Sequence, residues 1–248
     1  MTDPTARFTG RSAAYAAARP TYPPALIELL GVRPGMVVGD LGSGTGIFTK
    51  LLLDAGATVF AIEPNDEMRA SADAELGAHP RYRGVAGRAE ATTLPDASCD
   101  LLTAAQAFHW FDADATRREA KRILKPGGRV ALIWNDRDTT STPFLRELEA
   151  LLVARCPKYR DLQGKADRPD LWDAFFDGWT RREVPNEQRL GRAGLVLRLL
   201  STSYAPAEGE PGHDAFVREA EALFERHAGD AGEVAIVYAA VVIEGRPR

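Results

Sequence analysis

The glycine-rich segment Gly42-Ser43-Gly44-Thr45-Gly46 constrains the fold more than any other part of this 248-residue chain. It separates a continuous apolar run at 36–41, typical of a buried strand, from a stretch at 47–56 whose apolar residues recur at helical spacing. Glycines let a backbone turn tightly and approach a ligand closely, and the start of a helix presents free N–H groups. The segment therefore predicts a strand, a ligand-binding loop and a helix in succession.

The same alternation continues to residue 135. Apolar runs predict four more strands, at 58–64, 81–87, 99–106 and 129–135. Helical patterns lie at 65–76, capped by Asn65 or Asp66, and at 112–124, capped by Asp112. The segment Lys125-Pro126-Gly127-Gly128 is expected to break the chain before the last of these strands. Repeated strand–helix–strand order predicts an α/β fold with a parallel sheet, whose ligands bind at the carboxyl ends of the strands.

The remaining residues, 136–248, follow a different pattern. Helices are predicted at 143–156, 169–176, 195–204 and 214–229, and strands at 180–188 and 233–245. We find no internal repeat, so this part is expected to complete the same sheet and cover the site.

Charge and composition exclude several classes of protein. The chain has 31 basic and 35 acidic residues, interspersed, which argues against a nucleic-acid partner. It has neither a signal-peptide pattern nor a run of about 18 apolar residues, so we expect a cytoplasmic protein without a membrane partner. Cys99 and Cys156 match no metal spacing and are expected to be free thiols, and no metal is predicted. A monomer and a homodimer both remain open.

An acidic residue narrows the ligand class. Glu63 lies 21 residues beyond Gly42, at the end of the second predicted strand, where a carboxylate can accept both hydroxyls of a ribose. The glycine spacing is G-x-G-x-G, with Ile47 where a dinucleotide fingerprint needs glycine, and no GK[ST] follows as a P-loop requires. These features predict a nucleoside-bearing cofactor other than a dinucleotide.

At this point a family resemblance emerges. The strings VVGDLGSGTG, Glu63-Pro64, GRAEATTLPDASCDLL and RILKPGGRVALIW resemble the successive motifs of class I S-adenosylmethionine-dependent methyltransferases. AQAFHWFD at 105–112, with YAAARPTYP upstream at 15–23, resembles the small-molecule subgroup that includes trans-aconitate methyltransferase-like enzymes.

The resemblance implies a Rossmann-like fold: a mostly parallel seven-stranded sheet with helices on both faces and an antiparallel last strand. It also implies a single domain over 1–248. The expected parts are N-terminal lid helices at 1–35, a cofactor-binding core at 36–135, a helical substrate cap at 136–180 and sheet completion at 181–248.

The cofactor implied is S-adenosyl-L-methionine, with S-adenosyl-L-homocysteine as product. By the resemblance, Tyr15 or Arg19 would meet the methionine carboxylate and Glu63 the ribose. Arg88 stands where many relatives carry Asp, which leaves Glu90 or a backbone carbonyl for the adenine amino group. The implied cofactor-binding residues are Tyr15, Arg19, Asp40, Gly42, Ser43, Gly44, Glu63, Pro64, Met68, Ala89, Glu90, Gln106 and Ala107.

His109, just past the fourth predicted strand, is the candidate catalytic residue. It could act as a general base, or it could be a scaffold that holds its loop. Arg137 could pair with an acceptor carboxylate or be a solvated charge. The candidate substrate-binding residues are Tyr22, Trp110, Trp134, Asn135 and Arg137.

The activity expected is methyl transfer to a small-molecule acceptor at oxygen, nitrogen or carbon, with a carboxylate or hydroxyl favoured. Catalysis would depend first on in-line placement of the reacting atoms. Two alternatives stay open: an enzyme of the same cofactor that releases methylthioadenosine, and a binding module without catalysis.

Overall fold

The protein forms one seven-stranded sheet within the part described by the computed structural model, residues 19–159 and 167–248. The strand order is β3-β2-β1-β4-β5-β7-β6, and β7 is antiparallel to both of its neighbours while the other pairs are parallel. The predicted α/β class with an antiparallel last strand is therefore confirmed. The strands are β1 Val37–Leu41, β2 Thr58–Ile62, β3 Tyr82–Val85, β4 Cys99–Ala105, β5 Leu124–Arg137, β6 Phe176–Leu190 and β7 Val234–Pro247.

Helices follow most of these strands, and side chains cap two of them. Asn65 and Asp112 accept hydrogen bonds from the N–H groups of Met68 and Ala115, which confirms both predicted caps. None of the helices in the described ranges has the length and apolar character to cross a bilayer. The helices are α2 Pro24–Leu29, α3 Ile47–Asp54, α4 Asp66–Leu76, the short 3₁₀ helix η2 Phe108–Trp110, α5 Ala113–Ile123, α6 Pro143–Arg155, α7 Pro169–Phe175, α8 Arg192–Leu200 and α9 His213–His227.

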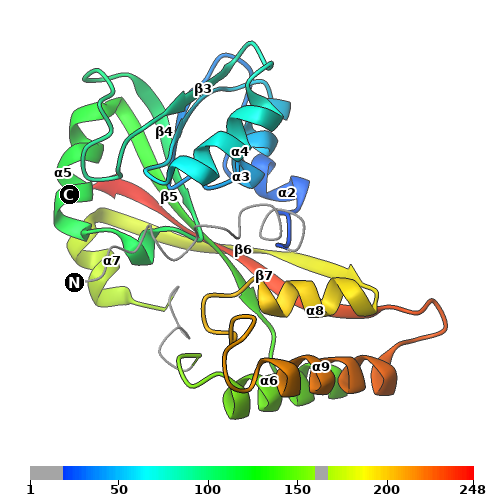
Figure 1. Cartoon of the computed structure of the whole chain (residues 1–248). Helices are drawn as coiled ribbons and strands as arrows, with labels where there is room; N and C mark the ends of the chain where they lie inside the picture. Colours follow the sequence, from blue (N-terminus) through cyan, green and yellow to red (C-terminus); the bar gives the residue numbers. More distant parts are fainter. Residues whose placement is uncertain (1–18, 160–166) are drawn as a thin grey trace.

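Two hydrophobic clusters cover the two faces of the sheet. Successive strand residues point to opposite faces, so Leu102 packs with Trp172 of α7 in one cluster, and Leu101 packs with Leu26 of α2 in the other. Both faces are thus sealed by helices, which leaves the strand ends as the place for a ligand (Figure 1).

A third cluster lies beyond this core. The long strands β6 and β7 extend past the other strands, and α6, α8 and α9 pack beside that extension (Figure 1). Leu148, Leu199, Phe224 and Tyr238 are all buried there. This helical layer draws on both the predicted cap at 136–180 and the segment at 181–248.

Two strands begin several residues earlier than the sequence predicts. Residues 125–128 were expected to break the chain, yet β5 begins at Leu124, which pairs with Cys99 across an irregularity in register before Leu101. The proline and glycines thus produce a bulge rather than a loop. β6 begins earlier than predicted, at Phe176, because this fully buried side chain belongs to the core.

Candidate functional site

Two adjoining hollows open at the carboxyl ends of β1, β2, β4 and β5. They lie where the strand order reverses, since β1 is flanked by β2 on one side and by β4 on the other. We call them the first hollow, about 730 Å³, and the second hollow, about 570 Å³, both open to solvent. They share Gly42, Gly44, Ala105 and Gln106.

The loop after β1 presents its backbone to both hollows. The N–H groups of Gly42 and Ser43 donate to the carbonyl of Ile62, which fixes the loop against β2. Gly42 has a φ of +66°, and a Cβ there would lie 2.7 Å from the Cβ of Ala107. Gly44 also has a positive φ, +57°. The glycines therefore let the chain pass where a side chain would not fit.

Glu63 lines the first hollow with a buried carboxylate. Its side chain is buried, at 7% exposure, and its two oxygens accept the N–H groups of Gly44 at 2.9 Å and Asn65 at 2.8 Å. Arg69 donates to the Glu63 carbonyl and holds the backbone. Burial raises the pKa of this carboxyl, against the lowering effect of the two N–H donors. Since each carboxylate oxygen has two lone pairs, both can still accept a hydroxyl from a ligand.

Asp40 contributes a second buried carboxyl, at the second hollow. Its oxygens accept the hydroxyls of Thr49 on α3, at 2.7 Å, and Thr103 on β4, at 2.9 Å. Burial raises its pKa to about 6. Asp40 thus ties three elements together beneath the glycine loop and carries a charge that changes near neutral pH.

Other lining residues of the first hollow come from α4, from the turn before it and from the segment after β3. Pro64, Met68 and Ala89 supply apolar surface, and Glu90 accepts the N–H of Asp112 at 2.9 Å. Two residues beyond Glu90, Thr92 is held by Glu119 of α5, which also pairs with Arg122. These hydrogen bonds, those from Arg122 above all, lower the pKa of Glu119 to about 2.

The end of β4 forms the boundary between the hollows. Gln106 has a φ of +59°, rare for a residue with a side chain, and its amide nitrogen lies 3.3 Å from the carbonyl oxygen of Asn135. Ala107, Trp110 and Phe111 line the first hollow. His109 sits on η2 with its ring 4.8 Å from that of Trp110, and it is not among the described residues that line either hollow.

The candidate substrate-binding residues separate into two groups. Tyr22 and Asn135 line the second hollow. Trp134 is buried in the core against Trp172, because alternation along β5 turns it to the face opposite Asn135. Arg137 is paired with Glu149 of α6 at 2.5 Å. The structure therefore does not bring Trp134 and Arg137 to the hollows.

Two arginines reach the second hollow from outside the strands. Arg19 lines it, as does Arg198 of α8, which the sequence analysis missed. A signal existed, because Arg198 stands between Leu195 and Leu199 on the apolar face of its helix. Tyr15 and residues 1–18 of the predicted lid at 1–35 lie outside the described residues.

Comparisons with known proteins agree with this geometry. Residues 39–132 match the family model described as a methyltransferase domain. An uncharacterized methyltransferase of Mycobacterium tuberculosis is 40% identical over 197 residues, which cover 79% of this chain and 76% of that protein. An uncharacterized methyltransferase of Schizosaccharomyces pombe is 35% identical over 143 residues, covering 56% of this chain and 55% of the relative.

Solved structures agree as well. A protein from Anaeromyxobacter dehalogenans, assigned as a type II methyltransferase, superposes with a TM-score of 0.69 at 25% identity, covering 92% of this chain and 97% of that one. A protein from Anabaena variabilis, assigned as a methyltransferase of an antibiotic biosynthesis pathway, gives a TM-score of 0.60 at 23% identity, covering 88% and 94% of the two chains. The second likeness supports the fold alone.

Proposed function

Because this chain belongs to the class I S-adenosylmethionine-dependent methyltransferases, we propose that it transfers a methyl group to a small-molecule acceptor bound at the second hollow. The observation that carries the proposal is the joined pair of hollows around Gly42 and Gly44. One hollow has the buried Glu63 carboxylate in its lining, and the other is bounded by Asp40 and two arginines.

The residues present fit S-adenosylmethionine. Gly42 and Gly44 line both hollows with backbone alone, so a ligand can lie directly against the chain there. In the first hollow, Glu63 would accept the ribose hydroxyls, Pro64 and Met68 would pack on the adenine, and Ala89 with Glu90 would border its edge. Ser43 would continue the backbone contact into the second hollow. When bound, the cofactor supplies a methyl group on a positively charged sulfur, with a neutral leaving group.

The second hollow suits the methionine end. Asp40 would attract the ammonium group, and Arg19 would pair with the carboxylate. Gln106 and Ala107 would line the boundary where the two ligands meet. The protein's contribution is mainly placement, which in favourable cases lowers a barrier by roughly 7–11 kcal/mol.

The acceptor would lie toward Tyr22 and Asn135, with Trp110 as an apolar wall. Interspersed charges and a net charge of −4 favour a small molecule over a nucleic acid. His109 would act from η2, next to Trp110, either by accepting a proton or by holding that wall in place.

Incubation with methyl-labelled S-adenosylmethionine and a metabolite extract tests this proposal. We expect S-adenosylhomocysteine and one labelled small product. Release of methylthioadenosine would instead identify the non-methylating alternative, and tight cofactor binding without any product would identify a binding module.

A further inference from the structure

Arg198 is a buried cation facing the second hollow. It lies on α8, on the same helical face as Leu195 and Leu199, and is only 9% exposed. An arginine costs considerable solvation energy when it is removed from water. Because Arg198 nevertheless lies on an otherwise apolar helix face beside the second hollow, its position points to a role in binding a ligand.

The side chain is held in a fixed position. Its Nε donates to the hydroxyl of Tyr238 at 3.2 Å, and the guanidinium carbon lies 6.0 Å from the centre of the same ring. Tyr238 belongs to β7 and is itself 3% exposed. Because a guanidinium has five N–H donors in a planar fork, it can keep its contact with Tyr238 and still donate to a ligand in the hollow.

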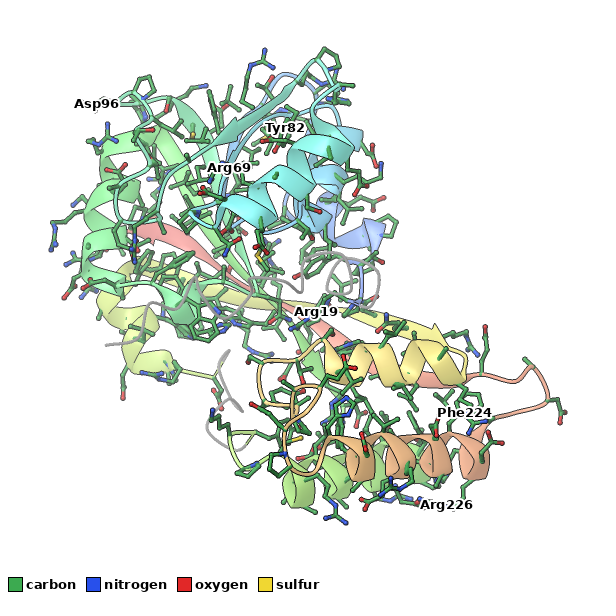
Figure 2. All side chains as sticks on the ribbon, in the orientation of Figure 1. Arg19, Arg69, Tyr82, Asp96, Phe224 and Arg226 are labelled. Carbon is green, nitrogen blue, oxygen red and sulfur yellow. The ribbon has the colours of Figure 1, made fainter. Side chains whose placement is uncertain are left out.

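Arg19 approaches the same end of α8. Its Nη2 donates to the carbonyl of Ser201 at 3.1 Å, and the hydroxyl of Ser201 donates to the carbonyl of Arg198 at 2.8 Å. In Figure 2, Arg19 lies beside α8, where the long strands leave the main body of the protein. Arg19 and Arg198 thus both line the second hollow.

The described lining of the second hollow contains two arginines and one acidic side chain. Among its described lining residues the acidic side chain is Asp40, whose oxygens already accept two threonine hydroxyls. The methionine end of the cofactor carries one carboxylate and one ammonium group. Arg19 and Asp40 would match these two charges, which leaves Arg198 as the lining cation placed to meet an anionic group of the acceptor.

We propose that Arg198 recognises an anionic group, a carboxylate or a phosphate monoester, on the methyl acceptor. The planar guanidinium can donate two parallel hydrogen bonds to either group, which gives orientation as well as affinity. The inference rests on the proposed function and deepens it, because it assigns a substrate class to the second hollow.

The test uses the full-length protein in four forms: wild type, R198M, R198K and R192M. Arg192 lies on the same helix but is exposed, which makes R192M a matched control. Binding of S-adenosylhomocysteine is measured first by calorimetry. The cofactor-loaded proteins are then titrated with small carboxylates and phosphate monoesters, each paired with its neutral amide or alcohol.

We expect one of the two probe series, the carboxylates or the phosphate monoesters, to bind the loaded wild type about 10–100-fold more tightly than its neutral partners. This is the range for hydrogen bonds to a charged group. R198M should abolish this preference, R198K should keep part of it, and R192M should keep all of it. Affinity for S-adenosylhomocysteine should stay within about twofold throughout, because other residues hold the cofactor. The probe series that shows this preference identifies the anionic group as a carboxylate or a phosphate.

Three results would overturn the inference: no anionic preference in the wild type, the same loss in R192M, or a weaker cofactor affinity in R198M with the preference intact. The last would assign Arg198 to the cofactor. A wild type that does not bind S-adenosylhomocysteine would instead contradict the proposed function itself. If R198M does not fold, Y238F replaces it, and we expect a smaller loss of preference with cofactor affinity unchanged.

Discussion

Gly44 donates its backbone N–H to Oε2 of Glu63 across 2.9 Å, joining the loop after β1 to the end of β2. One carboxylate therefore both shapes the glycine loop and lines the hollow that the loop borders. Because the two functions share one side chain, a substitution at residue 63 should affect the loop and the ligand together.

The first prediction concerns this carboxylate. Glu63→Ala removes the proposed acceptor of the ribose hydroxyls, and hydrogen bonds to a charged group contribute about 1.5–3 kcal/mol. We expect affinity for S-adenosylhomocysteine to fall about 10–100-fold by calorimetry. Glu75→Ala, an exposed glutamate on α4, is the control. A folded Glu63→Ala protein with wild-type affinity would contradict the assigned role.

The second prediction concerns the close approach at Gly42. Alanine there combines a positive φ with a Cβ 2.7 Å from that of Ala107. We expect Gly42→Ala to lower cofactor affinity by more than about tenfold and stability by roughly 2–5 kcal/mol, the sum of strain and overpacking. Calorimetry and urea unfolding measure the two effects.

Gly127→Ala is the matched control, because Gly127 has a φ of +84° but nothing lies within 4 Å of the point that its Cβ would occupy. Its loss should be roughly 1–2 kcal/mol of stability, from the left-handed backbone alone. Equal effects at the two glycines would show that space at Gly42 is unimportant.

The third prediction follows from the pKa of Asp40, about 6 in the folded protein against an ordinary value of 3.8. The folded state holds this proton more tightly, so the stability that the group contributes is complete below the ordinary value and is lost as pH rises through 6. We expect Asp40→Asn to gain about 2 kcal/mol relative to wild type between pH 4 and 7, measured by urea unfolding at each pH. A constant difference would contradict the raised pKa.

The same titration should govern cofactor binding. If ionised Asp40 attracts the ammonium group, affinity for S-adenosylhomocysteine rises as pH rises through 6 and then levels off. Calorimetry across this range should show the rise in wild type and a flat profile in Asp40→Asn. A rise that persists in the variant would assign the titration to another group.

The fourth prediction addresses His109. Since placement is expected to dominate catalysis, His109→Gln should lower kcat for the acceptor by less than about tenfold, whereas loss of a general base costs about 10²–10⁴-fold. Steady-state kinetics with the labelled cofactor would measure this. A fall of at least a hundredfold with loss of pH dependence would establish His109 as the base.

Features set by neighbouring residues could be predicted from the sequence. The glycine loop, the caps Asn65 and Asp112, and the position of Glu63 each depend on a few adjacent residues. Parallel strands then bring these local features to one edge of the sheet, which is why the first hollow lies where the sequence indicated.

Features that depend on partners distant in the chain could not be predicted from the sequence. Arg137 ends a strand whose carboxyl end lies at the site, but α6 supplies Glu149, which holds the Arg137 side chain elsewhere. Arg198 reaches the second hollow only because α8 docks against Tyr238 of β7. Pairing between distant strands likewise outweighed the local signal of Pro126 and Gly127, since β4 still pairs with β5 at Leu124.

The third hydrophobic cluster packs separately from the two that cover the sheet. Its members on α6, α8 and α9 belong to neither of the two clusters that flank the central strands. Under the proposed function, substitutions in this cluster would change the side of the second hollow that Arg198 lines, while the residues around Glu63 stay in place. Directed evolution toward new acceptors has its natural target in the last hundred or so residues of the chain.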